Sequence, residues 1–184
     1  MPNKRKLSKQ ERRHYYEQMP RRYTKQRQRN AAAVPGCQKM IFVLDHLKAG
    51  FNVAKIFRSA ESFGVHEIHL IDIAPFDPAP SKGAFRKVPA RFHDDFDSCH
   101  RELIERDYKI FTLEPDCDAA LNTTELPEKS AFIMGHEEHG ISFDRSHYDI
   151  QCLSIPQYGA TQSLNVSIAA SIVMYEYSSR FRGG

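Results

Sequence analysis

The chain has 184 residues, of which 41% are hydrophobic and 11% aromatic, a composition that suits a globular protein with a substantial core. No apolar run reaches the length of a membrane span, and the charged N-terminus does not resemble a secretory leader, so a cytoplasmic protein is expected. The four cysteines are scattered, which predicts reduced thiols rather than disulfides or a zinc site.

The net charge of +3 is unevenly distributed. Residues 1–30 hold 11 Lys and Arg against 2 acids, whereas the remainder holds 15 against 21. A basic segment on a mildly acidic body favours nucleic-acid binding, with a solubilising tail as the alternative. The candidate phosphate contacts in this segment are Arg12, Arg13, Arg21 and Arg22. The aromatic rings that could stack on bases are Tyr15, Tyr16 and Tyr23.

The N-terminal residues are expected to form a partly helical basic arm over residues 1–35, followed by a folded domain over residues 36–184. Ser8 and Glu11 have the capping-box spacing, which predicts a helix over residues 9–19 that stops before Pro20. Residues 21–30 are too polar to pack, and residues 31–36 are typical of a linker ending in a Pro-Gly turn.

From residue 40 onward, apolar strands alternate with helical patterns. Strands are predicted over residues 40–44, 67–73, 109–113, 131–134 and 150–155, with helices over residues 52–63, 94–106 and 164–180. Residues 75–89 are rich in turn signals, and residues 117–129 are loop-like. This order predicts an α/β fold with a mostly parallel sheet covered by helices on both faces. The last helix is apolar all round, so part of its surface is expected to meet a second subunit.

Three segments carry candidate functional residues. In the first, Asn52 stands at a helix start and Arg58 follows six residues later, flanked by Phe57 and small residues. That setting favours a partly buried guanidinium, which would need an anionic partner such as phosphate. A helix cap and a surface charge are the alternative interpretation.

The second segment, residues 135–142, reads GHEEHGIS after an apolar strand. Its glycine spacing imitates a P-loop, but Ile141 replaces the required lysine, and Glu137 and Glu138 would repel phosphates. This pattern disfavours a nucleoside triphosphate and favours a cationic or hydroxyl-bearing ligand. The H-E-E-H order does not match a zinc-binding H-E-x-x-H motif, so no metal is expected.

The third segment, residues 155–167, joins a strand to the last helix. Pro156 ends the strand and Gly159 permits a tight turn. Ser163 is the expected N-cap of the helix. A polar loop between a strand end and a buried helix is where α/β folds commonly bind ligands.

Together these three segments resemble the signature motifs of the SpoU-type (TrmH-like) RNA ribose methyltransferases of the SPOUT superfamily. The resemblance spans residues 38–177, and residues 81–84 (SKGA) are similar to a smaller family element. It implies an α/β sheet with a C-terminal trefoil knot, an exception to the rule against knotted chains. It also implies S-adenosylmethionine as cofactor and a homodimer built on the last helix and the helix of the first motif.

The resemblance further implies a set of site residues, with Arg58 as the catalytic arginine. The other residues in the catalytic set are Asn52, Glu137, Ser163 and Asn165. The expected cofactor contacts are Met134, Gly135, Gly140, Ile155, Ser163 and Leu164. RNA phosphates are expected at the arm and at a cluster comprising Lys82, Arg86, Lys87 and Arg91. Methyl transfer from a sulfonium to a ribose 2′-hydroxyl needs no metal.

The sequence alone does not identify the RNA substrate. A separate N-terminal substrate domain is not evident, which resembles the compact tRNA-modifying members and favours tRNA over rRNA. A non-catalytic RNA-binding relative is the second hypothesis. A nucleotide-binding enzyme of dehydrogenase type is the third, and it lacks the expected G-x-G-x-x-G after the first strand.

Overall fold

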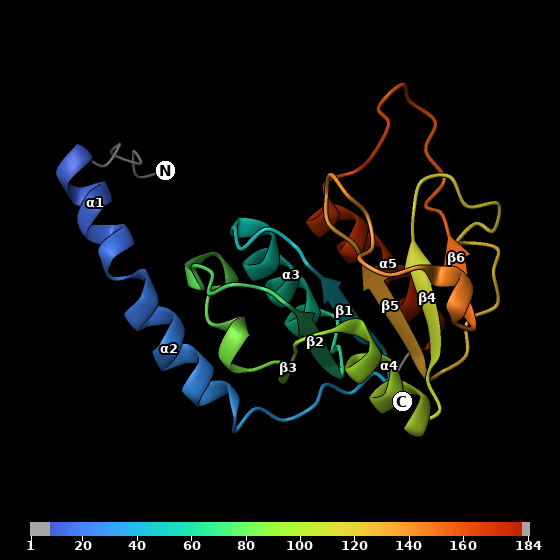
Figure 1. Cartoon of the computed structure of the whole chain (residues 1–184), viewed down its shortest axis with the longest axis horizontal. Coiled ribbons are helices and arrows are strands. Elements are labelled where there is room, and N and C mark those ends of the chain that lie inside the picture. Colours follow the sequence, from blue (N-terminus) through green and yellow to red (C-terminus); the bar gives the residue numbers. More distant parts are fainter. Residues whose placement is uncertain (1–7, 182–184) are drawn as a thin grey trace.

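The computed structural model describes residues 8–181, apart from the side chain of Arg12. Six strands form one sheet in the order β3-β2-β1-β5-β4-β6, and every strand pairing is parallel (Figure 1). The strands are β1 Ile41–Asp45, β2 Glu67–Ile71, β3 Ala90–His93, β4 Lys109–Leu113, β5 Ser130–Met134 and β6 Ile150–Leu153. The helices are α1 Lys9–Glu17, α2 Met19–Asn30, α3 Phe51–Ser62, α4 Phe96–Glu105 and α5 Val166–Arg180, with short 3-10 turns η1 Ala79–Ser81, η2 Ala84–Arg86 and η3 Arg145–His147.

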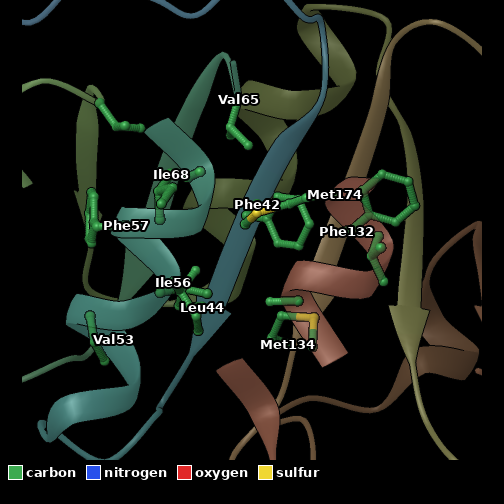
Figure 2. Close-up of a cluster of buried hydrophobic side chains, with 14 of the residues drawn as sticks. Phe42, Leu44, Val53, Ile56, Phe57, Val65, Ile68, Phe132, Met134 and Met174 are labelled. Carbon is green, nitrogen blue, oxygen red and sulfur yellow. The ribbon is translucent and has the colours of Figure 1, made fainter. Parts of the chain in front are cut away.

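Helices cover both faces of the sheet because successive strand residues point to opposite sides. Figure 2 shows Phe42 of β1 and Phe132 of β5 among side chains of α3 and α5, including Ile56 and Met174. The alternate residues of the same strands, such as Val43, belong to a second buried cluster with α4. The predicted mostly parallel sheet with flanking helices is confirmed. Within residues 8–181 no helix is both long and apolar enough to span a membrane.

The edge strand β3 was not predicted. Its four residues read ARFH, and none of them is fully buried. A strand that is short, half-exposed and partly charged lacks the apolar run by which the other strands are identified. It lies directly after the turn-rich segment over residues 75–89.

The first helix, α1, has the predicted capping box of Ser8 and Glu11 but ends at Glu17 rather than at residue 19. A second helix, α2, starts at Met19 and carries Pro20 in its first turn, where a missing N–H costs nothing. The prediction that residues 21–30 cannot pack is also wrong. Tyr23 is only 5% exposed, and its ring lies 5.7 Å from that of Phe85 and 5.3 Å from that of Phe76.

Asn30 joins the end of α2 to the segment that leads into β3 through side-chain hydrogen bonds. Its buried Nδ2 donates to the carbonyls of Phe85 (2.5 Å) and Val88 (2.7 Å), and its Oδ1 accepts from the amide of Ala90 (3.0 Å). Helix α2 therefore shares the core of the body. The predicted division of the chain at residue 35 stays a prediction, and residues 1–7 of the predicted arm lie outside the described residues.

The prediction that the cysteines are reduced thiols is wrong for two of the four. Cys117 and Cys152 are paired as a disulfide with Cα atoms 5.7 Å apart, because β4 and β6 are neighbours and bring the segment after β4 beside β6. Cys37 is exposed and Cys99 is buried, and both are free thiols.

Replacing Asn30 with alanine should lower the free energy of unfolding by about 2–3 kcal/mol, because three buried backbone groups lose their partner. The exposed Gln28 on the same helix provides a control, and Gln28→Ala should change stability by less than about 0.5 kcal/mol. Urea denaturation measures both. Equal stability of the two variants would show that the hydrogen bonds of Asn30 do not stabilise the segment that leads into β3.

Candidate functional site

A cavity of about 430 Å³ lies beyond the carboxyl ends of β4, β5 and β6 and beside the start of α5. Its size falls in the range of small-molecule sites, roughly 300–1,000 Å³. All six residues predicted as cofactor contacts line it: Met134, Gly135, Gly140, Ile155, Ser163 and Leu164. Two residues of the predicted catalytic set, Glu137 and Asn165, line it as well.

The loop after β5 folds tightly back on itself. The amide of His136 donates to the carbonyl of Gly140 (2.7 Å), and the amide of Gly140 donates to the carbonyl of His136 (2.9 Å). A Cβ atom on Gly135 would lie 2.5 Å from the carbonyl carbon of Gly140, a distance that no real side chain tolerates. Gly135 therefore lets two stretches of backbone close together and form one wall of the cavity.

A buried carboxylate holds the far end of this loop. Asp45, at the end of β1, accepts hydrogen bonds from the amide (2.6 Å) and hydroxyl (2.8 Å) of Ser142. Its side chain is fully buried and also contacts the Nδ1 atom of His46 at 2.6 Å. Because β1 and β5 are parallel neighbours, this contact ties the loop to the adjacent strand end.

The three sequence motifs meet at the cavity. Asn52 Nδ2 donates to Glu137 Oε1 at 2.9 Å, and Asn165 Nδ2 donates to Asn52 Oδ1 at 3.3 Å. The neighbouring Glu138 forms an ion pair with Lys48 at 2.6 Å, and the hydrogen bond from that ammonium lowers the pKa of the Glu138 carboxyl. Residues that are 85 and 113 positions apart in the chain are thus joined by side-chain hydrogen bonds.

Ser163 is not the N-cap of the last helix. Helix α5 begins at Val166, and Asn165 caps it by accepting from the amide of Ser167 (3.0 Å). Its Oδ1 also accepts from the Ser167 hydroxyl at 2.6 Å. The chain before Asn165 stays irregular, which leaves Ser163 exposed on the cavity lining.

Arg58 does not line the cavity, and its side chain is exposed rather than partly buried as predicted. Six residues along a helix correspond to about 9 Å of rise and about 240° of rotation. Because the Asn52 side chain points toward Glu137, the Arg58 side chain projects from a different face of α3. The structure of one chain does not bring this residue together with the rest of the predicted catalytic set.

Sequence reasoning missed part of the cavity wall. Leu113 ends β4, Glu114 and Pro115 follow it, and Gln157 follows β6. Their position just beyond the carboxyl ends of parallel strands is a usable signal, since ligands in open α/β sheets bind there.

The predicted RNA contacts differ in their surroundings. Arg22 is half-buried, lies 3.6 Å from Asp77 and packs over the Tyr15 ring, so it docks α2 onto the body. The predicted base-stacking role of Tyr23 is wrong, because this ring is buried. The exposed predicted cations are Arg13, Arg21, Lys82, Arg86, Lys87 and Arg91. Three of them are in ion pairs: Arg13 with Glu17 (3.0 Å), Lys87 with Glu61 (2.6 Å) and Arg91 with Glu67 (2.9 Å). The Arg12 side chain lies outside the described part of the chain.

The convergence of these motifs agrees with comparison against known proteins. Residues 39–175 match the SpoU rRNA methylase family. The chain belongs to this family. The resemblance inferred from the three motifs is thereby confirmed.

Several relatives indicate what the family does. A 23S rRNA (guanosine-2′-O-)-methyltransferase of Xylella fastidiosa is 30% identical over 77% of this chain and 59% of its own length. A tRNA (guanosine(18)-2′-O)-methyltransferase of Thermus thermophilus is 28% identical over 73% of this chain and 71% of its own length. This chain therefore spans about three fifths of the rRNA-modifying relative.

A solved structure has the same fold. The SpoU methyltransferase AviRb of Streptomyces viridochromogenes, in complex with the cofactor AdoMet, superposes with a TM-score of 0.71 at 21% identity. The match covers 82% of this chain and 60% of that protein.

Replacing Gly135 with alanine should lower the free energy of unfolding by about 1–3 kcal/mol, because the new methyl group overpacks the closed loop. Gly159 is a matched control, since a Cβ there would meet nothing within 4 Å. Gly159→Ala should change stability by less than about 0.5 kcal/mol. Chemical denaturation compares the two. If both variants were equally stable, the close approach of Gly135 to Gly140 would not be a constraint.

Proposed function

We propose that this protein transfers a methyl group from S-adenosylmethionine to a ribose 2′-hydroxyl of RNA. The observation that carries the proposal is the hydrogen bonding of Asn52 to Glu137 and Asn165, two residues that line the cavity. One polar residue comes from each of the three family motifs. Such an arrangement can hold a hydroxyl group in a fixed orientation beside a bound ligand.

The cavity lining suits S-adenosylmethionine. Leu113, Met134, Ile155 and Leu164 provide apolar walls for a flat base. Carboxylates on the same lining, Glu114, Glu137 and Glu138, favour a ligand that carries positive charge and ribose hydroxyls. When bound, this cofactor would supply an electrophilic methyl group activated by its positive sulfur, so no metal is needed. The fold neighbour AviRb was crystallised with the same cofactor.

Arg58 is proposed to bind a phosphate of the RNA or the oxyanion that develops at the 2′-hydroxyl. A guanidinium presents a planar fork of donors that matches phosphate. It remains protonated in proteins, so it stabilises negative charge rather than removing a proton.

We propose that a homodimer places Arg58 at a cavity. Helices α3 and α5 are in contact through Ser59 and Ser171, whose hydroxyls lie 2.8 Å apart. Large apolar side chains on the same two helices face solvent in the single chain: Phe51 is 54% exposed, Ile168 52% and Tyr175 63%. A second copy would cover them. We also propose that the C-terminal part of the chain forms a trefoil knot and that the protein is cytoplasmic.

RNA is proposed to lie across α1, α2 and the segment between β2 and β3. Arg21, Lys82 and Arg86 are exposed there, and exposed cations bind phosphates irrespective of sequence. A tRNA substrate is favoured, and rRNA is the alternative. Curated relatives of each kind match at similar identity, 28% and 30%.

Incubation of the full chain with methyl-labelled S-adenosylmethionine and total RNA should yield 2′-O-methylated nucleosides after digestion, detected by mass spectrometry. Arg58→Ala should lower the rate by at least about 100-fold, a loss of the size seen when a group that stabilises transition-state charge is removed. Cofactor affinity, measured by equilibrium dialysis, should stay unchanged. The exposed Lys55 of the same helix is the control, and Lys55→Ala should retain the rate.

Near-normal turnover of Arg58→Ala would remove this residue from the catalytic set. A wild-type chain that binds RNA and cofactor but transfers no label would instead support the non-catalytic relative. Separate assays with purified tRNA and rRNA fractions distinguish the two substrates.

Replacing Arg21, Lys82 and Arg86 together with alanine should flatten the salt dependence of RNA binding. Each lost phosphate contact reduces the magnitude of the slope of log K against log salt by about 0.7–0.9. The slope of the triple variant should therefore be smaller in magnitude by about 2–3. Lys109 and Lys129 lie at the opposite, amino-terminal ends of β4 and β5, and alanine at these two positions is the control. An unchanged slope in the triple variant would remove this surface from the RNA site.

A further inference from the structure

A buried polar cluster lies in the half of the sheet away from the cavity. Strand β2 reads EIHLI and is fully buried, yet it carries Glu67 and His69 on the face covered by α4. His93 of the edge strand β3 and Cys99 of α4 reach the same point. Of the four groups of potential metal ligands within the described residues, the group of His69, His93 and Cys99 is the only one that contains two buried members and no carboxylate.

Three ligand atoms converge in this cluster. The Nδ1 atom of His69 lies 3.0 Å from Nε2 of His93 and 3.3 Å from Sγ of Cys99. Donor atoms around a tetrahedral Zn²⁺ with metal–nitrogen distances of about 2.0–2.1 Å and metal–sulfur distances of about 2.3 Å are about 3.3–3.6 Å apart. The two distances from His69 are close to the spacing that one metal ion imposes, and all three ligand atoms lie within 4.8 Å of one another.

The surroundings of His69 match those of a metal-binding histidine. Its other nitrogen, Nε2, contacts Glu67 Oε1 at 3.1 Å. A carboxylate on the second ring nitrogen fixes the tautomer that leaves Nδ1 free to bind. Glu67 is itself held by Arg106 and by Arg91 at 2.9 Å, so it serves as a fixed support rather than as a ligand.

A fourth donor is in reach. One carboxylate oxygen of Glu102 lies 3.9 Å from Nε2 of His93. The side chain of Glu102 is 28% exposed, which gives an ion a path from solvent. A thiolate from Cys99 and the carboxylate of Glu102 together balance a charge of +2.

We propose that His69, His93 and Cys99, completed by Glu102, bind a divalent transition metal of the Zn²⁺ class. Binding displaces the Cys99 thiol proton to solvent and leaves the proton of His93 on Nδ1, which faces the hydroxyl of Ser98 at 3.4 Å. The ion joins β2, β3 and α4, and its role is structural. The sequence suggested no metal because the ligands are spread over 34 residues and have no motif spacing.

The test is titration of the full chain with Co²⁺ after treatment with a chelator, without reductant so that Cys117 and Cys152 stay paired. We expect saturation at about one ion per chain, with the intense visible bands of tetrahedral Co²⁺ and a thiolate-to-metal charge-transfer band. Excess Zn²⁺ should remove both. A wild-type chain that shows no charge-transfer band would overturn the proposal.

Two variants and two controls locate the site. Cys99→Ser should abolish the charge-transfer band, whereas replacement of the exposed free Cys37 by serine should leave it intact. His93→Gln, on the half-exposed edge strand, should weaken Co²⁺ binding at least tenfold with unchanged circular dichroism. Replacement of the exposed His147 by glutamine should not weaken it. A band retained in Cys99→Ser, or wild-type affinity in folded His93→Gln, contradicts the site even if the other variant does not fold.

Discussion

The side-chain contacts of Asn52 with Glu137 and with Asn165 are the interaction on which the site depends. Asn52 lies in the first turn of α3, Glu137 follows β5, and Asn165 caps α5. The parallel register of β1 and β5 places the ends of these strands side by side, and α3 packs against α5. The core therefore determines the geometry of the polar groups, and the polar groups contribute little to holding the core.

The loop after β5 shows how backbone constraints shape the cavity. Gly135 permits a closed turn that a side chain would open, and Asp45 holds the end of that turn through Ser142. Since a buried carboxylate is stable only when its oxygens are satisfied, the turn and the strand end stabilise each other. The result is one wall of the cavity where two stretches of backbone lie close together.

Much of the fold could be predicted because buried parallel strands are continuous apolar runs. The residues that line the cavity could be named because they are grouped in motifs, but Arg58 does not lie among them. The predictions that failed concern contacts between residues that are distant in sequence. Helix α2 is polar in sequence, and Arg22, Tyr23 and Asn30 dock it through contacts with residues at least 53 positions away. The N-cap falls on Asn165 rather than Ser163 because the preceding loop stays irregular to follow the cavity. Pairing of Cys117 with Cys152 likewise requires the neighbouring positions of β4 and β6.

The central claim is that the carboxyl ends of β4, β5 and β6 form a pocket for a positively charged sulfur donor. Isothermal titration calorimetry of the full chain with S-adenosylmethionine tests it most directly. The account predicts saturable uptake that is competed by S-adenosylhomocysteine and weakened when Leu164, on the cavity wall, is replaced by a charged residue. Absence of any saturable heat with folded protein would contradict it.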